Sequence, residues 1–166
     1  KKENYWLDWL NSKSWTTCFI DGNHENFSRI YNFPEEEWHG GKVHNIRKNI
    51  KHLMRGEVFT IEEKKFFCFG GARSHDIWDG LIDVNDSDWK QQAKLWTKQN
   101  KMFRIKGLSW WEQEVPSQEE MDHGIETLDS IGWNVDYVVT HCCASSTQAL
   151  IGHGMYKPDK LTNYLD

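Results

Sequence analysis

The sequence predicts a single mixed α/β domain. Its length of 166 residues is close to the size of one average domain. Short runs of β-branched and aromatic residues alternate with segments whose apolar residues recur at helical spacing. The first third of the chain is predicted to run helix, strand, polar loop and helix, which is half of a parallel α/β unit.

The N-terminal elements are the simplest to justify. Apolar residues recur at helical spacing over residues 5–10, and we expect Trp6 and Trp9 to lie in the core. Thr16–Ile20 is a short β-type run that breaks into a polar turn. Asn26 is placed to cap a short helix that follows this turn.

The middle of the chain predicts a β-meander or a pair of hairpins. Three β-type runs, Ile50–Met54, Val58–Ile61 and Phe66–Phe69, follow one another. Residues 55–56 and 62–65 separate these runs as turns.

The C-terminal half predicts more helices and one more strand. Ser117 and Glu120 form a capping-box pattern, and Gly132 is placed to end the helix that they open. Val135–Thr140 is predicted to be a buried strand. Further helices are expected within residues 83–98 and from Pro158 onward.

The composition of the chain limits the classes of molecule that it is expected to bind. Twenty basic and 25 acidic residues give a net charge of −5, which disfavours a protein that grips duplex nucleic acid. We therefore expect nucleic acid only as a substrate. No apolar run is long enough to span a membrane, and no signal-peptide pattern follows Lys1. Four cysteines without a zinc-ribbon spacing favour free thiols in the cytoplasm.

The C-terminal helix starts close to the end of the sequence. A helix that continues only from Pro158 to Asp166 buries little apolar surface. We therefore expect the chain to be a fragment of a longer protein.

Two predicted strands end in polar loops that carry histidine. Ile20 leads into Asn23, His24 and Glu25, and a later strand leads into His141. An imidazole nitrogen suits Mn, Fe or Zn, while an amide oxygen suits harder cations. A histidine beside the asparagine could protonate a leaving group. The alternative for each histidine is a hydrogen-bonded structural role.

Three segments carry a resemblance to a known family. Phe19–Glu25 resembles the Gly-Asn-His-Asp/Glu motif of calcineurin-like metallophosphoesterases. Val138–His141 resembles the later strand of that family, which ends in a metal-binding histidine. Phe69–Asp76 is similar to a Gly-Gly-Ala segment of bacterial and phage members.

The resemblance implies a fold, a reaction and site residues. The fold would be part of a four-layer αββα sandwich with two mixed β-sheets. The reaction would be two-metal hydrolysis of a phosphomonoester or phosphodiester, with Mn, Fe or Zn as the two cations. Asn23 and His141 would bind the second metal, and His24 would stabilise the transition state or protonate the leaving oxygen.

The sequence departs from the family at both ends. The Asp-x-His, Gly-Asp and Gly-His-x-His motifs are absent, and Gly152–Gly154 is predicted to be a loop. We expect the missing motifs before Lys1 and after Asp166. The bridging aspartate would then be missing, so the isolated chain is expected to be inactive.

Several residues and functions stay open at this point. Glu25 is expected outside the first ligand shell. His75 and Asp76 either orient substrate or form a surface turn, and Arg73 either contacts phosphate or is solvated. A non-catalytic interaction domain that retains the fold is the alternative function. A cysteine-dependent hydrolase using Cys142–Cys143 is a third, against which a packed thiol is the commoner case.

Overall fold

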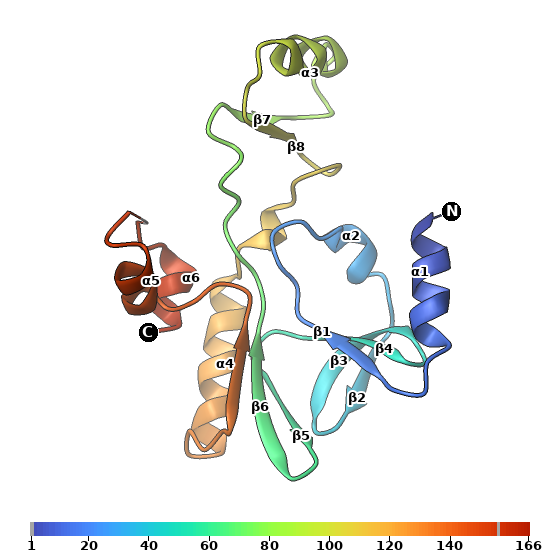
Figure 1. Ribbon diagram of the computed structural model, residues 1–166, viewed down its shortest axis with the longest axis vertical. Helices are drawn as coiled ribbons and strands as arrows, with labels where there is room; N and C mark the ends of the chain where they lie inside the picture. Colours follow the sequence, from blue (N-terminus) through green and yellow to red (C-terminus); the bar gives the residue numbers. More distant parts are fainter. Residues whose placement is uncertain (1, 156) are drawn as a thin grey trace.

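The computed structural model describes residues 2–155 and 157–166. Within these residues the chain is a mixed α/β protein with three small sheets and six α-helices (Figure 1). The predicted fold class is therefore confirmed at this coarse level.

The largest sheet, sheet A, places the first strand beside the fourth. Its strand order is β1 (Thr17–Phe19), β4 (Ile50–Leu53), β3 (Gly41–Arg47) and β2 (Glu35–Trp38). Strands β1 and β4 are parallel, with Phe19 opposite His52, and the other neighbours are antiparallel. The carboxyl end of β1 thus lies beside the carboxyl end of β4.

Sheet B repeats this arrangement with three strands. Its order is β5 (Glu57–Ile61), β6 (Lys64–Phe69) and β9 (Tyr137–Thr140). Strands β6 and β9 are parallel, with Phe69 opposite Thr140. In each parallel pair, one strand ends in a loop that carries a histidine: His24 follows β1, and His141 follows β9.

A third sheet and one helix form a separate extension. Strands β7 (Gly80–Ile82) and β8 (Phe103–Ile105) pair in parallel, and α3 (Trp89–Lys98) connects them. Figure 1 shows this unit reaching away from the two larger sheets.

The other helices begin at recognisable caps. Asn26 accepts a hydrogen bond from the backbone of Arg29 and caps α2 (Phe27–Ile30). Ser117 and Glu120 form the predicted capping box of α4 (Gln118–Ser130), and Gly132 follows its end with a positive φ of 63°. The remaining helices are α1 (Lys2–Asn11), α5 (Ser145–Ile151), α6 (Lys160–Tyr164) and the 3₁₀ turn η1 (Glu112–Glu114).

Two apolar clusters hold the layers together. Val43 and Leu53 of sheet A pack with Phe59 and Cys68 of sheet B. On the opposite face of sheet B, Phe67 and Phe69 pack with three residues of the C-terminal half, namely Met121, Leu128 and Leu161. Alternate residues of β6 therefore face sheet A and helix α4.

Some predicted elements differ from the structure. β2 and β3 form a hairpin that the sequence pattern did not predict, and β4 and β5 belong to different sheets. β9 was expected to be buried, but Val138 is 61% exposed and Val139 is 37% exposed. Trp6 and Trp9 were expected in the core, yet both are exposed on α1.

In the described ranges, 2–155 and 157–166, no helix combines the length and the apolar character needed to cross a lipid bilayer.

Candidate functional site

The loops after β1 and β9 meet where the two sheets adjoin. His141 directly follows β9, and its ring lies against the backbone of Gly22. A Cβ on Gly22 would stand 2.7 Å from Cε1, 2.9 Å from Nδ1 and 3.0 Å from Nε2 of this ring. A side chain at residue 22 would displace the imidazole, so glycine permits this close approach. The structure therefore brings His141 beside the Gly-Asn-His segment.

The side-chain amide of Asn23 makes its contacts through Nδ2. Its Nδ2 donates to Oγ of Ser74 at 3.3 Å and lies 3.4 Å from Nε2 of His24. The Oδ1 atom makes no hydrogen bond to any residue that the structure describes. A half-buried amide oxygen thus remains available as a ligand.

The Gly-Gly-Ala segment packs directly on this loop. The N–H of Gly71 donates to the carbonyl of Asp21 at 2.9 Å, and a Cβ on Gly70 would collide with the Asp21 carboxylate. Gly71 has a positive φ of 96°, which favours glycine. The two sequence segments that carried the resemblance are therefore in contact.

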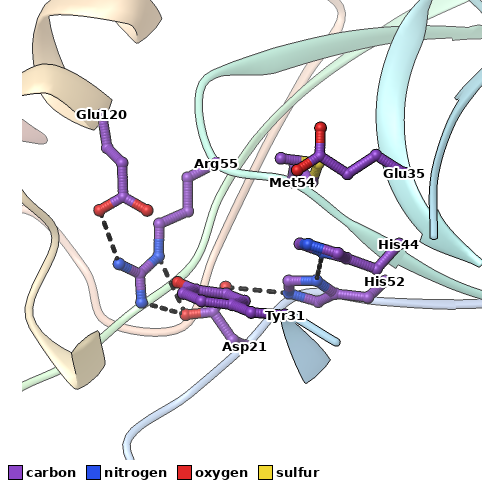
Figure 2. Close-up of a pocket in the computed structure, with 8 residues that line it drawn as sticks. All are labelled: Asp21, Tyr31, Glu35, His44, His52, Met54, Arg55 and Glu120. Atoms are coloured by element: carbon purple, nitrogen blue, oxygen red, sulfur yellow. Dashed lines mark hydrogen bonds and ion pairs between the residues drawn. The ribbon is translucent and has the colours of Figure 1, made fainter. Parts of the chain in front are cut away.

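A buried ion pair between Asp21 and Arg55 holds the loop that follows β1. Nε of Arg55 donates to Oδ2 of Asp21 at 3.0 Å, and Nη2 reaches the same oxygen. Nη1 of Arg55 also donates to Glu120 of α4 at 3.0 Å (Figure 2). Burial raises the pKa of Asp21, but the hydrogen bond from His52 and the Arg55 charge outweigh it, so the pKa lies below its ordinary value.

Two histidines extend this buried network. Nε2 of His52 lies 3.1 Å from Oδ1 of Asp21, and Nδ1 of His52 lies 3.0 Å from Nδ1 of His44 (Figure 2). Burial and the neighbouring His52 hold the pKa of His44 below its ordinary value. Burial raises the pKa of Tyr31, which stacks on His44, to about 12. These residues line a cavity of about 220 Å³.

A larger cleft opens beside His141. Its volume is about 920 Å³, and Arg73, His75 and Lys157 line it together with His141. These side chains bring cationic or potentially cationic groups next to the Gly-Asn-His loop. Such groups can offset the charge of an anionic ligand.

The remaining candidate residues differ in their surroundings. Asp76 is ion-paired with Arg104, whose hydrogen bond holds the pKa of Asp76 below its ordinary value. Glu25 is half-buried and makes no hydrogen bond or ion pair with the described residues.

The thiol of Cys142, beside His141, is packed and not activated. Sγ of Cys142 lies 3.8 Å from the carbonyl of Gly71, and burial raises its pKa to about 11. A thiol with that pKa is protonated near neutral pH, whereas a nucleophilic cysteine needs a thiolate. Cys143 is exposed at the cleft.

The donor set fits one cation better than two. The Oδ1 of Asn23 and the imidazole of His141 are ligands of the type that Mn, Fe or Zn accept. Among the described residues, no group of three or more His, Cys, Asp or Glu side chains is placed to hold a metal ion.

Several residues of this site escaped the sequence reasoning. Ser74, Glu114 and His52 were not predicted to take part. Arg55 was expected either to contact phosphate or to be solvated, and not to be buried in an ion pair. Asp21 had one usable signal, since a carboxylate between an apolar strand and glycine is expected to be functional or paired.

Comparison of the chain with protein-family models, curated proteins and solved structures found no match.

Proposed function

We propose that this chain contributes to a metallophosphoesterase that hydrolyses a phosphomonoester or phosphodiester with divalent metal ions. In this proposal Asn23 and His141 share one cation. His24 stabilises the transition state or protonates the leaving oxygen, and Arg73 or His75 contacts the phosphoryl group.

The observation that supports this proposal best is the contact between His141 and Gly22. The two histidine-bearing loops come from different sheets, and Gly22 permits their close approach. The free Oδ1 of Asn23 supplies a second neutral donor in the next residue. Two such donors from separate loops are typical of metal sites at the carboxyl ends of strands.

The layer arrangement is also compatible with the proposed family. Sheets A and B pack face to face, and α4 covers the outer face of sheet B. The family's αββα sandwich contains two mixed sheets packed in this way, and each large sheet here combines parallel and antiparallel pairs.

The chemistry divides between the cations and the side chains. Bound cations would supply an activated water and offset the phosphoryl charge. The residues of the chain have other tasks. His24 is exposed beside Asn23, where a proton could reach the leaving oxygen. Arg73 lines the cleft and could hold a non-bridging phosphoryl oxygen.

A titration with Mn²⁺ followed by NMR tests the metal position. Paramagnetic broadening is strongest near the ion, so signals of Gly22, Asn23 and His141 should disappear first. Asn23→Ala and His141→Ala should weaken binding. His153→Asn is the matched control because it removes an exposed imidazole from a turn with positive φ. Broadening centred elsewhere, or none, would contradict the proposal and favour the non-catalytic interaction domain.

A kinetic experiment tests the role of His24. In a parent protein that contains the missing motifs, Mn²⁺-dependent hydrolysis of bis(4-nitrophenyl) phosphate or 4-nitrophenyl phosphate can be measured, and His24→Ala should lower turnover by ~10²–10⁴-fold. Metal content should stay unchanged, because His24 is not a proposed ligand. Loss of metal in His24→Ala would contradict this assignment.

A further inference from the structure

We propose that Glu114 is a positioning residue that acts through Ser74. It fixes the Asn23 amide in the orientation that leaves Oδ1, rather than Nδ2, available to a cation. The orientation follows from hydrogen bonds within the chain, while its use in metal binding rests on the proposed function.

Glu114 is a deeply buried carboxylate that accepts two hydrogen bonds from Ser74. The residue is 1% exposed and lies in the turn η1. One carboxylate oxygen accepts from the backbone N–H of Ser74 at 2.8 Å, and the other accepts from its Oγ at 2.6 Å. Two acceptor oxygens facing two donors of one residue fix the position of both.

This arrangement determines which hydrogen bond the Ser74 hydroxyl donates and which it accepts. A serine hydroxyl has one proton, and here Glu114 accepts it. The oxygen of Ser74 can then only accept a further hydrogen bond. Asn23 must therefore present Nδ2 to Ser74, as it does at 3.3 Å.

The opposite orientation of the amide is unfavourable for the same reason. Turning the Asn23 amide by 180° would place Oδ1 against a Ser74 oxygen that has no proton left to donate. It would also remove the second contact of Nδ2, with Nε2 of His24 at 3.4 Å. Ser74 thus selects the orientation in which Oδ1 points away from it.

The backbone around Glu114 is tied to the same loop. The N–H of Ala72 donates to the carbonyl of Glu114 at 2.9 Å, and a Cβ on Gly71 would stand 2.9 Å from that carbonyl oxygen. Arg55 donates to the neighbouring carbonyl of Gln113 at 2.7 Å. The backbone that carries Glu114 is therefore held at two neighbouring carbonyls.

The substitution Glu114→Gln reverses the direction of the hydrogen bond between residue 114 and the Ser74 hydroxyl. A glutamine keeps the shape, and its Oε1 can still accept from the Ser74 N–H, but its Nε2 then donates to Oγ. The Ser74 proton becomes available to Asn23, which should turn and present Oδ1 inward. We expect the Kd for Mn²⁺ to rise about 10- to 100-fold, the usual effect of changing a group behind a metal ligand.

A second readout does not depend on metal. The Asn23 side-chain amide protons are hydrogen-bonded in the wild type, so they should exchange slowly with water. In Glu114→Gln they should exchange faster, because they face solvent. Glu112→Gln is the matched control: the residue lies on the same turn and is exposed, and both readouts should stay at wild-type values.

The outcomes separate this inference from the proposed function. Equal exchange rates and equal Mn²⁺ affinities in Glu114→Gln and Glu112→Gln would overturn the positioning role. Faster exchange in a protein whose wild type binds no Mn²⁺ would support the orientation and overturn the proposed function. If Glu114→Gln does not fold, Ser74→Ala replaces it, and it should likewise accelerate exchange and weaken Mn²⁺ binding.

Discussion

The imidazole of His141 lies where a side chain on Gly22 would project, although the two residues are 119 positions apart in sequence and follow strands of different sheets. The contact depends on the absence of a side chain at residue 22. It joins the loop after β1 to the loop after β9.

Gly22→Ala tests this contact. The new methyl group must displace the His141 ring, which is exposed and free to swing aside. We therefore expect a loss of stability below the about 1–3 kcal/mol typical of an overpacked core, measured by urea unfolding. Mn²⁺ binding should weaken markedly. In a His141→Ala background the same substitution should have no further effect on binding, and an additional loss there would contradict the displacement mechanism.

Asp21→Ala tests the buried ion pair. Arg55 would lose its fully buried partner and keep only Glu120, whose side chain is one-third exposed, so the unfolding free energy should fall by up to about 3–5 kcal/mol. The matched control is Asp76→Ala, which breaks a carboxylate–arginine pair whose side chains are about one-third exposed, and it should cost about 1 kcal/mol or less. Equal losses in the two variants would show that burial does not strengthen the dependence on Asp21.

The stability of the protein should decrease as the pH falls from 7 to 5. Burial and His52 hold the pKa of His44 below its ordinary value, despite the opposing charges of Glu35 and Asp21. The unfolded chain therefore takes up the proton first, near pH 6.5, and stability is lost from there down to the folded pKa.

This group can contribute at most about 1.4 kcal/mol per pH unit. Urea unfolding at several pH values should give a smaller slope for His44→Gln than for the wild type. The exposed His153 provides the control, since His153→Gln should leave the slope unchanged. An unchanged slope in His44→Gln would contradict the prediction.

Alkylation should distinguish the cysteines. Burial raises the pKa of Cys68 to about 12 and that of Cys142 to about 11, so at pH 8 only ~10⁻⁴ and ~10⁻³ of these groups are thiolate. Cys143 is exposed. Iodoacetamide should therefore modify Cys143 first, as followed by mass spectrometry of peptides. Early modification of Cys142 would contradict this prediction and support the hypothesis of a cysteine-dependent hydrolase.

The sequence was informative where structure depends on local patterns. The Asn26 cap, the capping box of Ser117 and Glu120, and the β5–β6 hairpin are confirmed because nearby side chains determine them. The β2–β3 hairpin was missed because the first strand contains three consecutive glutamates, Glu35–Glu37, which stay exposed. Burial of β9 was predicted wrongly because an apolar run indicates a strand but not what covers it.

The candidate site was predictable only in part. Asn23, His24 and His141 follow β-type runs, so their placement at strand ends could be anticipated. Arg55 and Glu114 could not, because their partners lie 34 and 40 residues away in sequence. No local pattern distinguishes a buried, paired charge from a solvated one.

Arg55 also has a consequence for the order in which the chain assembles. It lies between β4 and β5, where the chain passes from sheet A to sheet B, and its partners include Asp21, Gln113 and Glu120. Two of these partners are 58 and 65 residues away, and contacts that close such long loops form slowly. We therefore expect the loop that carries Asn23 to be secured late in folding, after both sheets and α4 have come together.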